Sequence, residues 1–253
     1  MDAKQPVSIT TIFSSTLNRE MTIRVAKDAS VDIETILLMH DGQNLFSDMD
    51  ASYGMSWNIL QGIDISKSKM MIVGVDCGEG LARLDEYSPF VNHHLQDVVD
   101  WIDRPVGGQG KKYIDFLVYE LLPKLYQKIG KEVPVVLGGS SMGGYISLAA
   151  AAYYPTIFQS VMSFSGALWF EMPSLLKLLE SADLSQLSVY MDTGTLESKE
   201  PLENDAYLKT NRSIASLLKS KAKKCYYHEF EGEKHNEKAW AKRIGPAVDW
   251  ILV

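Results

Sequence analysis

The chain has few of the features that mark membrane-spanning, disulfide-rich or nucleic-acid-binding proteins. No apolar run comes near the roughly 20 residues that a membrane helix needs. The two cysteines, Cys77 and Cys225, lie far apart and form no Cys-x-x-Cys pair, so we expect free thiols rather than a disulfide framework or a zinc cluster. Acidic residues outnumber basic ones by 32 to 25, and the net charge of −7 argues against a nucleic-acid surface.

The N-terminal sequence lacks the basic and apolar regions of a signal peptide. The segment "MDAKQPVSIT" therefore favours a cytoplasmic location, although a chain trimmed of its leader would begin in the same way. With 253 residues, 46% of them apolar, the chain is long enough for a sizeable core. We find no repeat and no linker, and we predict a single domain over residues 1–253.

Short apolar runs rich in β-branched residues recur along the chain and predict about eight strands. Several are apolar without a break, which is typical of strands buried on both faces of a parallel sheet. The first two alternate more, which favours an antiparallel pair at an edge. The runs are "VSITTIF" (7–13), "MTIRVA" (21–26), "TILLMH" (35–40), "MMIVGV" (70–75), "VPVVLG" (133–138), "SVMSFSG" (160–166), "LSVYMDTG" (187–194) and "CYYHEF" (225–230).

Helical patterns fall between the later strands. Strands that alternate with helices predict an α/β fold, in which helices cover both faces of a mostly parallel central sheet. Pro123 is expected to kink the first helix. The predicted helices cover 113–129, 144–154, 204–221 and 236–252.

Residues 77–112 interrupt this alternation with glycines, prolines and charges but no clear strand. A connection of this length inside a compact domain is usually functional. We interpret it as a lid-like insertion above one edge of the sheet.

A glycine-rich segment, "GGSSMGGY" (138–145), stands between a predicted buried strand and a predicted helix. Residues 139–143 match G-x-S-x-G, the sharp strand-to-helix turn that presents a nucleophilic serine, here Ser141. Ser140 fits less well, because Met142 rather than a glycine stands two residues after it. A phosphate-binding loop would need Gly-Lys-Ser/Thr, which is absent, and a linker would not join a buried strand to an alanine-rich helix.

A serine hydroxyl is a weak nucleophile at neutral pH and needs a neighbouring base. In hydrolases with this turn the order along the chain is serine, acid, histidine. Two histidines follow Ser141, and His228 lies within a predicted strand. His235 follows the last strand and precedes the last helix, so we predict it as the base.

Two carboxylates, Asp192 and Glu197, compete for the role of the acid. Asp192 falls within a strand-like run, where burial of a carboxylate is costly unless it is well hydrogen-bonded. Glu197 lies beyond Gly194, at the C-terminal end of the strand, where catalytic groups gather in open α/β sheets. We predict Glu197, and Asp192 remains the alternative, with a structural role if Glu197 is the acid.

Such a reaction also needs hydrogen-bond donors for the oxyanion. One should be the backbone N–H of Met142, directly after the nucleophile. The other should follow an early strand, and the "HDGQ" segment (40–43) offers the N–H of Gln43, with Gly42 allowing a close turn. The alternative for this segment is an ordinary turn.

With these residues in place, the sequence resembles the esterase D-like branch of the α/β-hydrolase superfamily, the "Putative esterase" family. This family includes feruloyl and acetyl xylan esterases, siderophore esterases, S-formylglutathione hydrolases and mycolyltransferase antigens. The resemblance implies Ser141, Glu197 and His235 as a triad, with Gln43 and Met142 as oxyanion donors. It runs from about residue 35 to the C-terminus, through "HDGQNLF", "SWNI", "RLDEYSPF", "FLVYELLP", "GGSSMGGY", "SGALW", "DTGTLE" and "GEKHNEKAW".

These features predict a serine carboxylic ester hydrolase that forms an acyl-enzyme with a small acyl ester, such as a carbohydrate-linked acetyl or aromatic acyl ester. A thioesterase or acyltransferase of the same family is the alternative, as is a non-catalytic binding protein on a hydrolase fold. The chemistry requires neither cofactor nor metal. The expected partner is a small-molecule or carbohydrate ester, without nucleic acid or membrane.

Two further groups of residues invite a functional interpretation. Trp57, Tyr87 and Trp169 are candidates for the substrate pocket, with core packing as the alternative. The segment 93–103 has the ligand types of a divalent-ion site, and we interpret it instead as a solvated face. Its candidate ligands are His93, His94, Asp97, Asp100 and Asp103.

Overall fold

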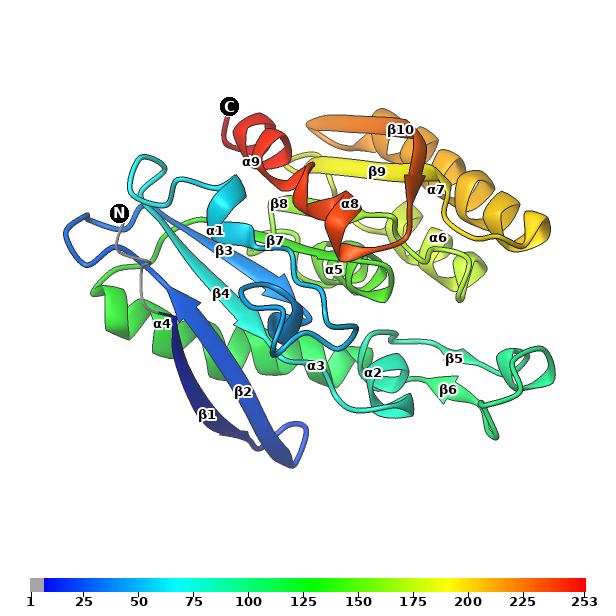
Figure 1. Cartoon of the computed structure of the whole chain (residues 1–253), viewed down its shortest axis with the longest axis horizontal. Coiled ribbons are helices and arrows are strands. Elements are labelled where there is room, and N and C mark those ends of the chain that lie inside the picture. The colour runs from blue at the N-terminus through cyan, green and yellow to red at the C-terminus, as the bar shows by residue number, and fades with distance from the viewer. Residues whose placement is uncertain (1–6) are drawn as a thin grey trace.

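A computed structural model describes residues 7–253, which form an eight-stranded twisted sheet with helices on both faces (Figure 1). The three strands at one edge pair antiparallel, and all other neighbours in the sheet are parallel. The predicted fold class is therefore confirmed, as is the antiparallel pairing of the first two strands. In sheet order the strands are β1 (Ser8–Ser14), β2 (Arg19–Ala26), β4 (Met70–Val75), β3 (Thr35–His40), β7 (Val135–Ser140), β8 (Ser160–Phe164), β9 (Ser188–Leu196) and β10 (Lys224–Lys234).

The central strands are buried on both faces, which explains their unbroken apolar sequences. Every residue of β4 and of β7 is buried, including Gly138 and Ser140. Alternating side chains of these strands enter two separate apolar clusters, one on each face of the sheet. The sheet thus forms a stiff middle layer, with its parallel strands ending along one edge.

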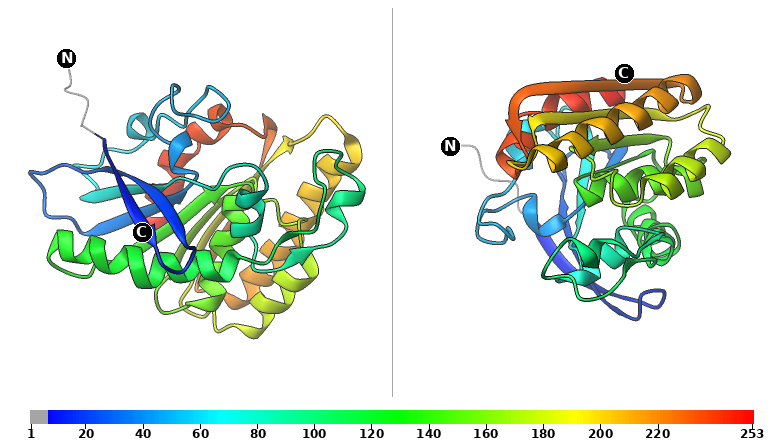
Figure 2. Two further views of the ribbon diagram at one scale, coloured as in Figure 1. Left: turned by 90° about the horizontal axis from the view of Figure 1, so that it is seen from below. Right: turned by 90° about the vertical axis from the view of Figure 1, so that its right-hand side faces the viewer.

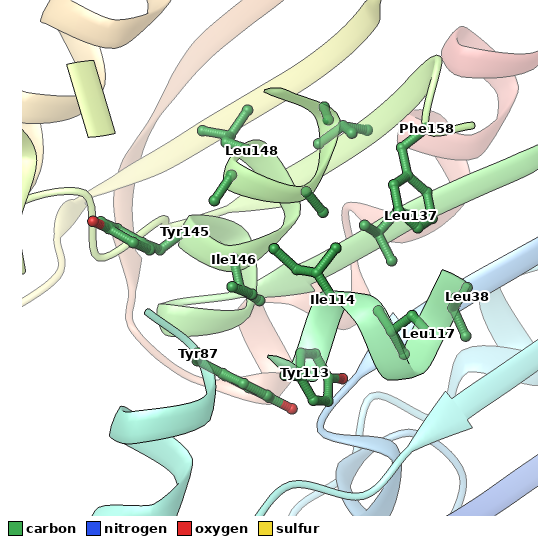
Figure 3. Close-up of a cluster of buried hydrophobic side chains, with 14 of the residues drawn as sticks. Leu38, Tyr87, Tyr113, Ile114, Leu117, Leu137, Tyr145, Ile146, Leu148 and Phe158 are labelled. Atoms are coloured by element: carbon green, nitrogen blue, oxygen red, sulfur yellow. The ribbon is translucent and has the colours of Figure 1, made fainter. Parts of the chain in front are cut away.

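The larger apolar cluster lies beneath five helices. Figure 3 shows part of this cluster, in which Leu117 lies next to Leu38. The smaller cluster lies under three short helices on the opposite face. Figure 2 gives two further views of these layers. The helices of the first layer are α3 (Gly110–Phe116), α4 (Leu122–Ile129), α5 (Met142–Tyr153), α6 (Met172–Ser181) and α7 (Pro201–Lys221), and those of the second are α1 (Ile59–Gly62), α8 (Glu237–Ala241) and α9 (Ile244–Leu252).

Two of the predicted helices are interrupted, each close to a proline. The first changes to a π-helical turn, η3 (Leu117–Leu121), before Pro123 at the start of α4. The last is divided into α8 and α9, with Pro246 in the first turn of α9. Proline has no N–H to donate to the carbonyl four residues earlier, so a regular helix does not continue through it.

The insertion after β4 holds a short helix and a small hairpin that projects from the body of the molecule (Figure 1). The side chain of Asp85 anchors the hairpin, since it accepts hydrogen bonds from the Gly107 N–H at 2.8 Å and from Arg104 at 2.6 Å. The prediction that this segment has no strand was wrong, although each strand has only two residues. The elements are α2 (Leu81–Glu86), β5 (Val91–Asn92), η2 (Leu95–Asp97) and β6 (Val106–Gly107).

None of the helices formed by residues 7–253 is long and apolar enough to cross a bilayer. Both cysteines are free thiols.

Candidate active site

Ser141 occupies the turn between β7 and α5, at the edge where the parallel strands end. Its backbone adopts φ 57° and ψ −123°, a region that glycine adopts more readily than other residues. The Ser141 N–H donates to the Phe164 carbonyl at 2.9 Å, and the Ser141 carbonyl accepts from the Ala167 N–H at 3.0 Å. Two bonds to the segment after β8 therefore hold the turn in place.

The glycines of the motif allow the strand, the turn and the helix to approach closely. A Cβ atom at Gly139 would lie 3.0 Å from the backbone of Gly143 and 3.1 Å from the His40 ring. Gly143 would in turn meet His40 at 3.2 Å. A side chain at these positions would push α5 away from β7 and displace Ser141.

His235 lies between the end of β10 and the start of α8, and its ring is fixed on several sides. The Nδ1 atom is 2.7 Å from Oε2 of Glu197. The rings of Tyr207 and Trp240 lie 5.0 Å from it, centroid to centroid. Its side chain is 23% exposed, whereas that of Glu197 is fully buried. His235 therefore presents its remaining ring nitrogen from a fixed orientation.

Besides His235, two donors hold the Glu197 carboxylate. Its Oε1 atom accepts from Ser165 Oγ at 2.6 Å and from the Gly194 N–H. Ser165 Oγ also accepts from the Trp240 indole N–H at 2.9 Å and from Arg243 at 3.3 Å. Ser165 is fully buried and thus joins the Glu197 carboxylate to the helices behind it.

The alternative acid, Asp192, is buried in the sheet and has other partners. Its carboxylate accepts from Tyr190 Oη at 3.0 Å and lies 3.5 Å from Arg243 Nε. Burial raises the pKa of Asp192 to about 7, with the charge of Arg243 acting against the rise. The structure therefore brings Glu197, and not Asp192, to His235.

The loop after β3 forms the other side of the site. Asp41 takes the left-handed conformation at φ 55°, and Gly42 lies so close to β4 that a Cβ atom would come within 2.6 Å of Gly74. The N–H groups of Gln43 and Met142 donate to no backbone carbonyl among residues 7–253. Both are thus available to a ligand at the predicted oxyanion position.

Asp41 is nearly buried and pairs with Arg83 of α2, which donates from Nε at 2.7 Å and from Nη2 at 2.8 Å. Burial acts to raise the pKa of Asp41, but the charge and hydrogen bonds of Arg83 outweigh it and hold the pKa below its usual value. The Asp41 N–H donates to Tyr87 Oη at 3.0 Å. The insertion therefore fixes the loop that carries Gln43.

A cavity of about 290 Å³ opens above Ser141. Cys77 is on its wall, but burial raises the pKa of this thiol to about 12, so it is not a competing nucleophile at neutral pH. The cavity is lined by Asp41, Gln43, Asn44, Ser52, Tyr53, Met55, Cys77, Arg83, Ser140, Ser141, His235, Asn236, Glu237 and Trp240.

The three aromatic residues expected in the substrate pocket do not line this cavity. Trp57 is 3% exposed and packs edge-on against Phe164 in the core. Tyr87 is fully buried and supports Asp41. Trp169 is partly exposed and packs against Tyr207. Trp57 and Tyr87 therefore fit the alternative of core packing, because aromatic identity alone does not tell which face of an element carries the ring.

Sequence reasoning missed two residues beside the site, Ser165 and Tyr207. Burial raises the pKa of Tyr207 to about 12, and hydrogen bonding with Trp169 and Ser141 acts against the rise. Tyr207 therefore lies close to both Ser141 and His235. Ser165 begins the "SGALW" segment of the family resemblance, but that segment did not indicate its contact with the acid, and Tyr207 belongs to no motif.

The candidate metal ligands of the insertion lie apart from this site. His94 and Asp97 approach to 3.9 Å, with side chains 93% and 66% exposed. Within residues 7–253, no three His, Cys, Asp or Glu side chains are grouped so that they could hold a metal ion.

The fold and the serine turn define a serine esterase of the α/β-hydrolase class. The chain belongs to the "Putative esterase" family, whose model matches residues 14–251.

Individual proteins are similar to this chain in sequence or in fold. The uncharacterized protein YbbA of Bacillus subtilis is 28% identical over 193 residues, which are 72% of this chain and 73% of that protein. An IroE-like serine hydrolase from Shewanella oneidensis shares the fold with a TM-score of 0.73 at 17% identity, over 98% of this chain and 79% of the other. The siderophore hydrolase EstB of Aspergillus nidulans matches with a TM-score of 0.72 at 17% identity, over 99% and 96%.

Proposed function

We propose that this esterase hydrolyses a small-molecule ester through an acyl-enzyme intermediate on Ser141. His235 removes the proton of Ser141 as its Oγ attacks the ester carbonyl, and then protonates the leaving alcohol. Glu197 holds the imidazole in one orientation and stabilises its charged form. Water, activated by the same histidine, then releases the acid and restores Ser141.

The observation that best supports this proposal is the 2.7 Å contact between Glu197 and His235, beside the turn that bears Ser141. The Glu197 carboxylate is fully buried, so its interaction with the imidazolium is little screened by water. Ser141 and His235 line the same cavity. These observations support the proposed roles of Ser141 as nucleophile, His235 as base and Glu197 as acid.

The backbone donors support the same chemistry. The N–H groups of Gln43 and Met142 would stabilise the negative charge that develops on the carbonyl oxygen. Neither donates to another backbone carbonyl in the part of the chain that the structure describes. The Asp41–Arg83 pair holds the loop of Gln43, and the backbone bonds of Ser141 hold the turn before Met142, so little reorganisation is needed when the charge forms.

The cavity favours a substrate of modest size with polar groups. Its volume of about 290 Å³ is at the lower end of the range for small-ligand sites. Several solved structures of the same fold are siderophore hydrolases or enterobactin esterases, which act on small-molecule esters. A siderophore-type ester is therefore the first substrate class to test, beside acetylated and feruloylated sugars.

The test combines covalent labelling with turnover. A fluorophosphonate should label the wild-type protein once, at Ser141, as located by peptide mass spectrometry. Ser141→Ala should abolish labelling and lower the turnover of a nitrophenyl ester by about 10⁴-fold or more. Ser140→Ala is the matched control, and we expect it to retain most of the activity. A folded Ser141→Ala protein with near-normal turnover would refute the proposal.

A further inference from the structure

One carboxyl group in the cavity has no role in the proposed reaction. Glu237 is the first residue of α8, two positions after His235, and only 5% of it is exposed. It lines the cavity beside Ser141. Its Oε1 atom accepts a long hydrogen bond from Asn44 Nδ2 at 3.4 Å, and its own backbone N–H, at the start of α8, also interacts with the carboxylate. No Lys, Arg or His side chain among residues 7–253 forms an ion pair with it.

The other carboxyl group of the cavity has a very different environment. Both oxygens of Asp41 accept from Arg83, at 2.7 and 2.8 Å, so the positive charge of Arg83 neutralises the Asp41 carboxylate. Arg83 is therefore committed to Asp41, and the charge of Glu237 is left without a cationic partner. A buried carboxylate without a cationic partner is costly to the folded protein unless a ligand compensates it.

The shift in the pKa of Glu237 agrees with this geometry. Burial raises the pKa of Glu237, and the negative charge of Asp41 adds to the rise, while the Glu237 backbone N–H, His235 and Arg83 act against it. The nearby donors and positive charges therefore do not offset the hydration that this carboxylate loses on burial. A cationic group entering the cavity would complete the interaction.

We propose that Glu237 is a substrate-binding residue that selects esters carrying a protonated amine. The amine would donate to the Glu237 carboxylate while the ester carbonyl lies at Ser141. This proposal rests on the proposed function, because it concerns the substrate of the same site. The net charge of −7 on the whole chain also favours the approach of a cation.

A purely structural role is the competing explanation. Asn44 belongs to η1 (Gly42–Asn44), so its bond to Glu237 connects the loop that carries Gln43 to the segment that carries His235. At 3.4 Å this bond is weak, and a neutral amide could accept it equally well. Glu237→Gln therefore keeps the structural role and removes only the charge.

The experiment compares esters that differ in one atom. Dimethylaminopropyl benzoate is paired with its carbon isostere, in which CH replaces the nitrogen, and nitrophenyl dimethylaminohexanoate is paired with its isostere in the same way. The first pair places the amine in the alcohol and the second in the acyl group. We expect wild-type kcat/KM to favour the amine in at least one pair by about tenfold, and Glu237→Gln to remove that preference. The preference should also fall as salt is added.

Glu231→Gln is the matched control, because Glu231 is exposed in β10, the strand before His235, and does not line this cavity. It should keep the amine preference, and thermal melts should show that both variants are folded. Equal wild-type rates within both pairs, a preference for the neutral members, or an unchanged preference in Glu237→Gln would overturn the inference.

Phosphonates that carry the same two groups give a readout without turnover. The amine-bearing phosphonate should label wild-type protein about tenfold faster than its isostere, and Glu237→Gln should label both at one rate. Labelling of Ser141 without discrimination would overturn the inference alone. No labelling by any phosphonate would refute the proposed function and this inference together.

Discussion

At the scale of single residues, Ser165 connects the proposed triad to the buried charges behind it. Its hydroxyl donates to Glu197 and accepts from Trp240 and Arg243. Arg243 also lies beside Asp192. Two carboxylates and one guanidinium therefore share a small buried volume, and the position of each depends on the others.

Glu197→Gln should lower turnover by about 10²–10⁴-fold, because the amide nitrogen would face Nδ1 of His235 and favour the wrong tautomer. The amide oxygen can still accept from Ser165, so we expect only a small decrease in melting temperature. Glu203→Gln, an exposed change nearby in α7, is the control. Normal turnover of a folded Glu197→Gln protein would exclude Glu197 as the acid.

Asp192 should make stability depend on pH. Its folded pKa is about 7, above the ordinary value of 3.8, so its contribution to stability is complete below the ordinary pKa and is lost as the pH rises towards 7. In thermal melts, the wild type should therefore lose stability relative to Asp192→Asn between about pH 4.5 and pH 8.

Asp183→Asn provides the comparison for these melts. Hydrogen bonds from Ser185 lower the pKa of Asp183, so it titrates below this pH window and its variant should follow the wild type. If the wild type instead gained stability over Asp192→Asn with rising pH, Arg243 would be holding Asp192 in its ionised form.

At the scale of elements, the insertion acts on the active site through α2 more than through its hairpin. Arg83 of α2 lines the cavity and holds Asp41, whereas Trp101 is 64% exposed and does not line the cavity. The idea that the whole insertion is a lid stays a prediction. Its best-defined contribution is to fix the loop that bears Gln43.

Arg83→Ala should destabilise the protein by about 3 kcal/mol, because it leaves Asp41 buried without a counter-charge. Turnover should decrease as well, since the loop with Gln43 loses its support. Arg104→Ala is the matched control within the insertion, because its pair with Asp85 is much more exposed, and we expect a loss within about 1 kcal/mol. Urea unfolding measures both, and equal losses would contradict a special role for Arg83.

At the scale of the whole molecule, one sheet separates two apolar clusters, and we predict that both unfold together. Trp57 and Trp240 belong to the smaller cluster, whereas Trp169 packs against the larger one. Tryptophan fluorescence therefore reports on both faces, and far-ultraviolet circular dichroism on the backbone. The two urea transitions should coincide, as expected for a single domain over residues 1–253. Separate transitions would divide the chain into two units.

The sequence predicted much of this architecture because parallel strands buried on both faces leave a strong local signal. All eight strands occur within a few residues of the predicted runs. Glu197 and His235 followed from their places after β9 and β10. The role of Ser165 in holding Glu197 could not be predicted in this way, because it depends on segments that meet only in the folded chain. Pro246 itself indicated that the last predicted helix is interrupted. The apolar residues at helical spacing around it favoured one continuous helix instead.

The backbone of Ser141 has a consequence for how this protein can evolve. A residue other than glycine held at φ 57° and ψ −123° costs on the order of 1–3 kcal/mol, and glycine would avoid most of that cost. If Ser141 is the nucleophile, its replacement by glycine would relieve the backbone strain and would also remove the activity. Selection for thermal stability and selection for catalysis then oppose each other at this position, so stabilised variants of this esterase must gain their stability elsewhere.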